Sequence, residues 1–348
     1  MNSLLFHIMS GTDLDWLLTV AKTQPVEPNQ IIPSSDNTAA RYLYLVLGPC
    51  AIAMPHQHPE NLKELIQLST DGCVGEMPGL ESCFSTARLQ ATVSCPVLSI
   101  DVAQLNEKLI EDTAFAAHFY QFQAVLVMQY LKALIQQFNL NPLVLYQINV
   151  KEASSLFAEL QDSHLDWCIT VGQRRQLVEG SVLQRANRPI ESLQIVLEGA
   201  LSLNSLMPSK PSSNEQPVAQ EIARLGRGDI FGEMRSLQSI GFSSMPVVQV
   251  KAERDTEILS IPYWRIFSKV LHDEEFALHY YRTLAHIMAS KYHTILSELG
   301  FLTQHTSQRQ LSDPLLEKVA KAEANFEWMV QRIQSKVIIG REIEWSCK

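Results

Sequence analysis

The sequence predicts an α+β protein made of two similar halves, each a β-rich barrel or jelly roll followed by long helices, with one more helix at the C-terminus. The first observation is an internal repeat: residues 12–20 return as 163–171, 74–77 as 231–234, and 115–120 as 276–281. The order is kept, so we interpret the repeat as a duplication. The second observation is that 348 residues suit about two domains of roughly 150 residues each.

The repeat predicts four parts along the chain. We expect a first domain over residues 1–138, a linker with a short helix over 139–160, a second domain over 161–299 and a helical tail over 300–348. Pro142 ends the helical pattern of the first copy, because proline cannot continue the hydrogen-bond ladder. The linker helix is expected around residues 151–160.

Each copy begins with short β-like runs that are separated by turn residues. In the first copy these runs include residues 42–47 and 51–54, and in the second copy 193–197 and 201–203. Many short strands at this spacing favour a barrel or jelly roll over a parallel sheet. Proline-rich segments follow at residues 55–59 and 208–217, and we expect both to be exposed loops.

Each copy ends in a long helical pattern, over residues 102–138 and 263–299. In the first, Phe115, Phe119 and Phe122 fall on one helix face. The tail restarts at Ser312-Asp313-Pro314, which supplies a cap and a first-turn proline before one more amphipathic helix. That helix is expected to pack on a domain or on a partner.

Composition narrows the class of protein. A hydrophobic fraction of 46% with 19% charge is typical of a globular protein, and no apolar stretch approaches the ~20 residues that cross a bilayer. We therefore expect no membrane insertion and a cytoplasmic location. The net charge is −9 without a basic run, so we expect no nucleic-acid partner. No C-x-x-C spacing occurs, and we expect free thiols at Cys50, Cys73, Cys83, Cys95, Cys168 and Cys347.

No motif supports catalysis or a metal site. The chain has no Gly-rich P-loop, no G-x-S-x-G and no H-E-x-x-H motif, so we expect no enzyme and no catalytic residues. Four histidines recur every seven residues, which separates neighbours by about 10 Å along a helix and is too far for one metal ion. These are His272, His279, His286 and His293.

The run Gly228-Asp229-Ile230-Phe231-Gly232-Glu233-Met234 resembles the phosphate-binding cassette of the cyclic nucleotide-binding domain family, to which the catabolite activator and the protein kinase A regulatory subunit belong. The likeness covers residues 10–138 and 160–299 through the repeat. It implies two eight-stranded jelly rolls. In such a cassette, glycine permits close backbone approach, the glutamate accepts from a ribose hydroxyl and an arginine clamps the cyclic phosphate.

Both copies depart from the family at the arginine. Ser85 and Ser243 stand where the arginine is expected, nine and ten residues after the respective glutamates. Arg88 and Arg235 lie nearby and are candidates to replace it. We therefore expect degenerate cassettes in which ordinary cyclic AMP binding is disfavoured. The candidate ligand-binding residues are Gly75, Glu76, Ser85, Arg88, Gly232, Glu233, Arg235 and Ser243.

Two functional interpretations remain. The first is a non-enzymatic regulatory or scaffold protein that works through protein partners and needs no cofactor. The alternative is a sensor whose cassettes hold a cyclic nucleotide or another nucleotide and pass the signal to the helices. A homodimer formed by the long helices is compatible with both. The tail lacks the further helices and basic face of a winged helix-turn-helix, so a transcription factor is disfavoured.

Overall fold

The computed structural model describes residues 3–32, 42–56, 58–68, 71–80, 87–148, 152–186, 188–207, 218–240, 248–301 and 313–345. By their contacts the residues form two compact units. Unit 1 joins Met1–Asn141 to Ala277–Arg309, and unit 2 joins Pro142–Phe276 to Gln310–Lys348. The last long helix of the second repeat therefore belongs mostly to unit 1. The repeat-based domain boundaries stay a prediction.

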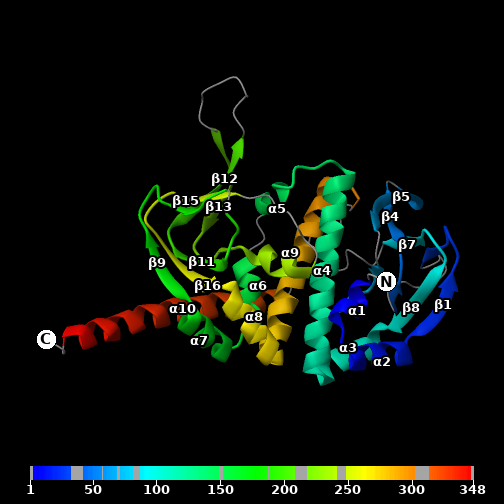
Figure 1. Cartoon of the computed structure of the whole chain (residues 1–348), viewed down its shortest axis with the longest axis horizontal. Helices are drawn as coiled ribbons and strands as arrows, with labels where there is room; N and C mark the ends of the chain where they lie inside the picture. Colours follow the sequence, from blue (N-terminus) through cyan, green and yellow to red (C-terminus); the bar gives the residue numbers. More distant parts are fainter. Residues whose placement is uncertain are drawn as a thin grey trace. The chain divides into compact units, whose positions relative to one another are not determined.

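Unit 1 contains two four-stranded antiparallel sheets, with strand orders β1-β8-β3-β6 and β2-β7-β4-β5 (Figure 1). Buried residues occur in succession along β3 and β6, so both faces of these two strands are covered. The strands are β1 (Lys22–Val26), β2 (Ile31–Ile32), β3 (Tyr42–Val46), β4 (Cys50–His56), β5 (His58–Leu68), β6 (Gly72–Gly75), β7 (Arg88–Ala91) and β8 (Cys95–Asp101).

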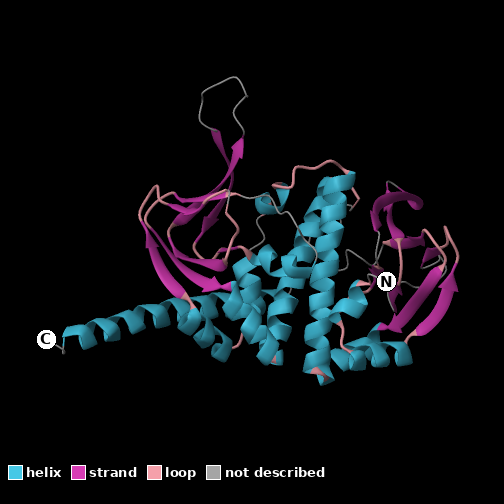
Figure 2. Ribbon diagram, viewed as in Figure 1, coloured by secondary structure: helices cyan, strands magenta, loops and turns pink. Residues whose placement is uncertain are grey.

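The helices of unit 1 flank these sheets (Figure 2). The long helix α4 packs against α9 through Tyr130 and Tyr292, whose ring centroids are 6.0 Å apart. The helices are α1 (Leu4–Ile8), α2 (Gly11–Val20), α3 (Val102–Glu111), α4 (Thr113–Gln137) and the greater part of α9 (Glu274–Glu298).

Unit 2 repeats the same topology. Its sheets have strand orders β10-β15-β12-β13 and β14-β11-β16-β9, which match those of unit 1 strand for strand when each strand is paired with its repeat. The strands are β9 (Gln173–Leu177), β10 (Val182–Gln184), β11 (Ser192–Glu198), β12 (Ala200–Met207), β13 (Val218–Gly226), β14 (Ile230–Phe231), β15 (Gln249–Ala252) and β16 (Thr256–Pro262).

The C-terminal helix packs within unit 2. Of the two alternatives from the sequence, packing on a domain or on a partner, the structure shows the first. The ring centroids of Phe157 and Phe326 are 5.2 Å apart, and Asn325 Nδ2 donates to the carbonyl of Phe157 at 2.7 Å. Arg332 pairs with Asp166 on α7 at 3.5 Å. The helices of unit 2 are α5 (Val144–Gln147), α6 (Glu152–Glu159), α7 (Asp162–Val171), the 3-10 helix η3 (Glu233–Ile240), α8 (Tyr263–His272), the start of α9, and α10 (Asp313–Trp345).

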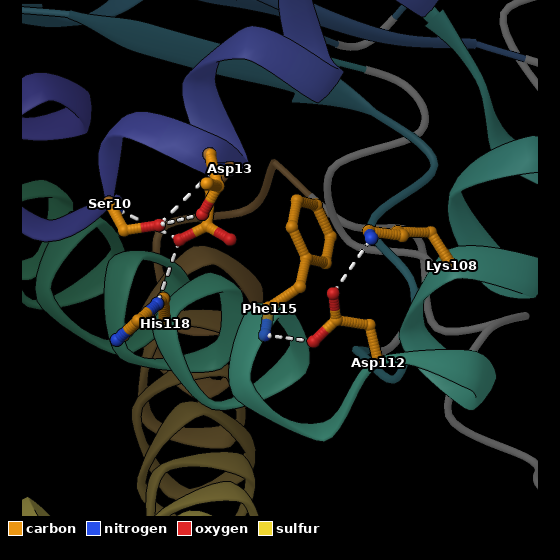
Figure 3. A network of polar contacts seen from close by, with 7 residues as sticks. Ser10, Asp13, Lys108, Asp112, Phe115 and His118 are labelled. Carbon is orange, nitrogen blue, oxygen red and sulfur yellow. Dashed lines mark hydrogen bonds and ion pairs between the residues drawn. The ribbon is translucent and has the colours of Figure 1, made fainter.

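A polar network at the start of α4 shows why the predicted helix over residues 102–138 is broken. Asp112 has an extended backbone, with φ −126° and ψ 99°, and its side chain accepts from the N–H of Phe115 at 2.9 Å and from Lys108 Nζ at 2.7 Å (Figure 3). Beside it, Asp13 of the Ser10 capping box lies 2.8 Å from His118 Nδ1. The aspartate ends α3 and caps α4.

The second copy reproduces this junction. Asp273 accepts from Lys269 Nζ at 2.5 Å and from the N–H of Phe276 at 2.9 Å, again between two helices. An edge-to-face contact is repeated as well, with centroid distances of 5.0 Å for Trp16 and Phe115 and 5.1 Å for Trp167 and Phe276. The duplication therefore extends to individual hydrogen bonds, and the predicted α+β fold with two jelly rolls is confirmed.

Some local expectations need correction or lie outside the described residues. The predicted exposed loop at residues 55–59 is wrong, because β4 continues to His56 and β5 begins at His58. Residues 208–217 fall outside the described part of the chain. Cys50, Cys73, Cys95 and Cys168 are buried free thiols, as predicted, whereas Cys83 and Cys347 are not described. Among the described helices, none has the length and hydropathy of a membrane span.

Candidate functional site

The two cassette glycines lie at the ends of equivalent strands and have nearly the same backbone conformation. Gly75 follows Val74 in β6 with φ +102°, and Gly232 follows β14 with φ +101°. A Cβ on Gly75 would lie 2.2 Å from the carbonyl oxygen of Tyr42, and one on Gly232 would lie 2.5 Å from the hydroxyl of Tyr263. Both positions require glycine for the backbone itself, whether or not a ligand approaches.

The two cassette glutamates differ in exposure. Glu76 is exposed, whereas Glu233 is only 4% exposed at the start of η3. Burial, and after it the negative charge of Glu233, raises the pKa of Tyr146. The sequence places the two glutamates at equivalent positions, but the structure gives them different surroundings.

The candidate replacement arginines also differ. Arg235 is exposed on η3. Arg88 begins β7, is half-buried and donates from Nη1 to the carbonyl of Ala87 at 3.1 Å. Burial, followed by Tyr42, raises the pKa of Tyr44, and the positive charge of Arg88 opposes this shift. Tyr44 lies beside Gly75, so the charge of Arg88 acts on a side chain next to the first cassette. Ser85 and Ser243 lie outside the described residues.

Helix α4 covers the first cassette. The fully buried Tyr130 accepts from the N–H of Cys73 at 2.7 Å and donates to the Cys73 carbonyl at 2.9 Å. Because β6 is at the edge of its sheet, Tyr130 takes the place of a neighbouring strand. About two turns nearer the N-terminus of α4, Gln123 Nε2 donates to the carbonyl of Pro78 at 3.3 Å. A Cβ on Gly79 would lie 2.7 Å from the hydroxyl of Tyr120.

The short helix α5 covers the second cassette. The rings of Tyr146 and Phe231 have centroids 6.2 Å apart, at an interplanar angle of 37°. Leu143 and Tyr146 both pack against the apolar cluster inside the jelly roll, to which Phe231 belongs. Helix α5 also contacts β13. The second cassette is thus bordered by a segment that precedes its own domain.

Two copies of one eight-stranded topology, each with a glycine turn after its sixth strand and a helical segment behind it, decide the architecture. The chain has two cyclic nucleotide-binding-like jelly-roll domains in tandem. No family model matches the chain, and no curated protein does. Solved structures do. A cAMP-bound regulatory chain, PfPKA-R, is 16% identical with a TM-score of 0.32 over 87% of this chain and 89% of that one.

Two further solved structures are similar to this chain. The regulatory subunit of a cAMP-independent protein kinase A from Trypanosoma brucei is 14% identical with a TM-score of 0.31, covering 91% of this chain and 92% of that one. A transcriptional regulator from Thermotoga maritima is 25% identical with a TM-score of 0.30, covering 40% of this chain and 98% of that one. No residue role is transferred from these structures.

Sequence reasoning missed the tyrosines that surround the two cassettes. Tyr130, Tyr146 and Tyr263 each contact a cassette strand or glycine, and none was a candidate. Tyr130 belongs to a helix that is apolar on several faces, so its hydroxyl had no local sign of a partner. Tyr146 had one sign, since residues 143–146 are a run of four apolar side chains in a segment interpreted as a linker.

Proposed function

We propose that the protein is a non-enzymatic regulatory protein that acts through protein–protein contacts, with two cyclic nucleotide-binding-like domains that do not bind cyclic nucleotides in the ordinary way. One observation carries the proposal: each cassette is covered by a tyrosine of the chain itself. Tyr130 is hydrogen-bonded to the strand that leads into the first cassette, and Tyr146 lies on Phe231 and near Glu233 of the second.

The sequence also disfavours ordinary cyclic nucleotide binding, because the residue expected to bind the cyclic phosphate is missing from both cassettes. Serines, at positions 85 and 243, stand where the family has its arginine. A hydrogen bond to a charged group contributes about 1.5 to 3 kcal/mol, so its loss lowers affinity by about 10- to 150-fold. The phosphate charge would also lie in the cassette without its counter-charge.

Exposed apolar side chains support a protein partner. Ile110 on α3 is 84% exposed and Leu271 on α8 is 79% exposed, and the two residues are equivalent in the repeat. Trp264, about two turns before Leu271 on the same face of α8, is 61% exposed. Large apolar side chains repeated at the same exposed position fit a contact surface. A protein partner, homodimerisation through the long helices and a cytoplasmic location are parts of this proposal.

The test is calorimetric titration of nucleotide-free protein with cyclic AMP, cyclic GMP and cyclic di-GMP, beside the variant Glu76→Ala/Glu233→Ala. We expect no saturable heat from any of the three. Micromolar binding that the double variant abolishes would overturn the proposal and make the protein a ligand sensor.

The sensor is the second candidate, and Arg88 favours it. Its charge reaches Tyr44, next to Gly75, so it is placed to meet an anion at the first cassette. In that case Arg88→Gln abolishes the heat of binding, whereas Arg235→Gln, on the exposed face of η3, leaves it unchanged.

A further inference from the structure

We propose that α5 is an internal ligand of the second domain: Leu143 and Tyr146 occupy the site that a nucleotide would use, and the site opens only when α5 leaves. The inference deepens the proposed function and rests on it for treating the second cassette as the ligand site. The main evidence is that the side chains of Leu143 and Tyr146 pack against the buried apolar cluster inside the jelly roll.

Tyr146 presents the kinds of group that a nucleoside presents. Its ring lies on Phe231, where a flat base would find an apolar surface, with centroids 6.2 Å apart. Burial, followed by the negative charge of Glu233, raises the pKa of the Tyr146 hydroxyl. Glu233 stands at the position whose carboxylate accepts a ribose hydroxyl in the family that the cassette resembles. One aromatic side chain therefore packs on the apolar wall of the site and lies within electrostatic reach of its buried carboxylate.

In the described part of unit 2, a tyrosine from α8 rather than from the long helix bonds to the second cassette, because Tyr263 donates to the carbonyl of Gly232. Lys291 lies at the position of Tyr130, 161 residues later, and it belongs to unit 1. In unit 2 the segment that lies on the cassette strand comes instead from before the domain. A covering helix that is part of the linker can be moved by whatever binds or pulls the linker, which a covering helix inside the domain core cannot.

Helix α5 is built to depend on this packing. It has four residues, and its turn is held by Tyr146 N–H to Leu143 O at 3.0 Å and Ile148 N–H to Val144 O at 3.2 Å. So short a helix is unstable without tertiary contacts. Release of α5 exposes Tyr146 and Leu143 together with Leu145, which is 3% exposed. The segment is therefore ordered when it is docked and is expected to lose its helix when it is displaced.

Occupation by α5 lowers the affinity for any competitor. A site that is open about 1% of the time binds a ligand about 100-fold more weakly than the open site does. The second domain would then ignore free nucleotide at ordinary concentrations and respond to events that displace the linker. With α5 in the site, the state of the second domain would depend on the position of its own linker rather than on the concentration of free nucleotide.

The experiment compares hydrogen exchange in four full-length proteins: wild type, Leu143→Ala/Tyr146→Ala, the milder Tyr146→Phe, and the control Gln147→Ala, which changes an exposed residue of the same helix. In the double variant we expect exchange of the β13 and β14 amides to rise at least about tenfold. Amides where α6 meets α10 in the same unit should be unchanged. Tyr146→Phe should show a smaller rise, because it keeps the ring on Phe231.

A second measurement uses adenosine and cyclic AMP as probes of the opened site. Either probe should protect β14 in the double variant and not in wild type. Equal exchange of β13 and β14 in the double variant and in Gln147→Ala would overturn the internal-ligand proposal, as would an equal rise throughout unit 2 in Tyr146→Phe. If wild type binds nucleotide and Glu233→Ala abolishes that binding, both the internal-ligand proposal and the proposed function are overturned. If only Glu76→Ala abolishes the binding, the proposed function is overturned and the internal-ligand proposal is not.

Discussion

Replacing Tyr130 by phenylalanine tests whether α4 holds the first cassette strand. The change keeps the buried ring and removes a hydroxyl that accepts from Cys73 N–H at 2.7 Å and donates to Cys73 O at 2.9 Å. Both backbone groups are buried, and β6 has no strand beyond it in its sheet. An unsatisfied buried group costs about 1 to 3 kcal/mol, so the pair predicts a loss of about 2 to 6 kcal/mol, with the lower end applying where water enters.

The assay is urea unfolding of the full chain, with exchange of the Cys73 amide as the local readout. Tyr292→Phe is the matched control, because it makes the same chemical change on the ring that packs against Tyr130 and leaves both bonds to Cys73 in place. We expect the Tyr130 variant to lose more stability than the control and to exchange its Cys73 amide faster. A loss below about 0.5 kcal/mol with unchanged exchange would refute the reasoning, because that is the range of a substitution without a structural role.

Three more predictions follow from the structure. Gly75→Ala should destabilise by at least about 1 to 3 kcal/mol, because φ is +102° and the new Cβ would meet a backbone oxygen, whereas Gly11→Ala, with open space around it, should be near neutral in the same urea assay. Phe326→Ala should lower the free energy of unfolding by about 3 kcal/mol and release α10, which would be measured as faster amide hydrogen exchange along that helix. Gln331→Ala, which changes an exposed residue of the same helix, is the control, and equal exchange in both variants would contradict the packing. The hydrogen bond from Lys108, followed by that from Phe115 N–H, lowers the pKa of Asp112 below 3.8. The ionised carboxylate therefore adds stability above pH 3.8, and this stability is lost as the pH falls through the pKa of the folded state. Asp112→Asn should be destabilised by at most about 1 kcal/mol at pH 7 and should match wild type near pH 2, and a difference that persists in acid would exclude this cause.

The cassette backbone was predictable because its requirement is local. Gly75 and Gly232 recur at the ends of equivalent strands, and the left-handed φ that each adopts is available to glycine alone at no cost. The helical patterns over residues 102–138 and 263–299 did not reveal the breaks at Asp112 and Asp273, each of which lies between two helices. An aspartate inside an apolar periodic pattern is compatible with a continuous helix, and only the hydrogen bonds to the following N–H groups show the new helix start.

The sequence by itself determined the duplication, the order of strands and long helices in each copy and the glycine turns of both cassettes, because periodicity, turn chemistry and repeat spacing are properties of short segments. Tertiary structure alone decided that Glu76 is exposed while Glu233 is buried, that Tyr130 caps the edge of β6, and that Tyr146 lies on Phe231. These outcomes depend on which distant segment comes to pack on each cassette. Two copies with the same local pattern can therefore differ in the one feature that governs binding, the residue that covers the site.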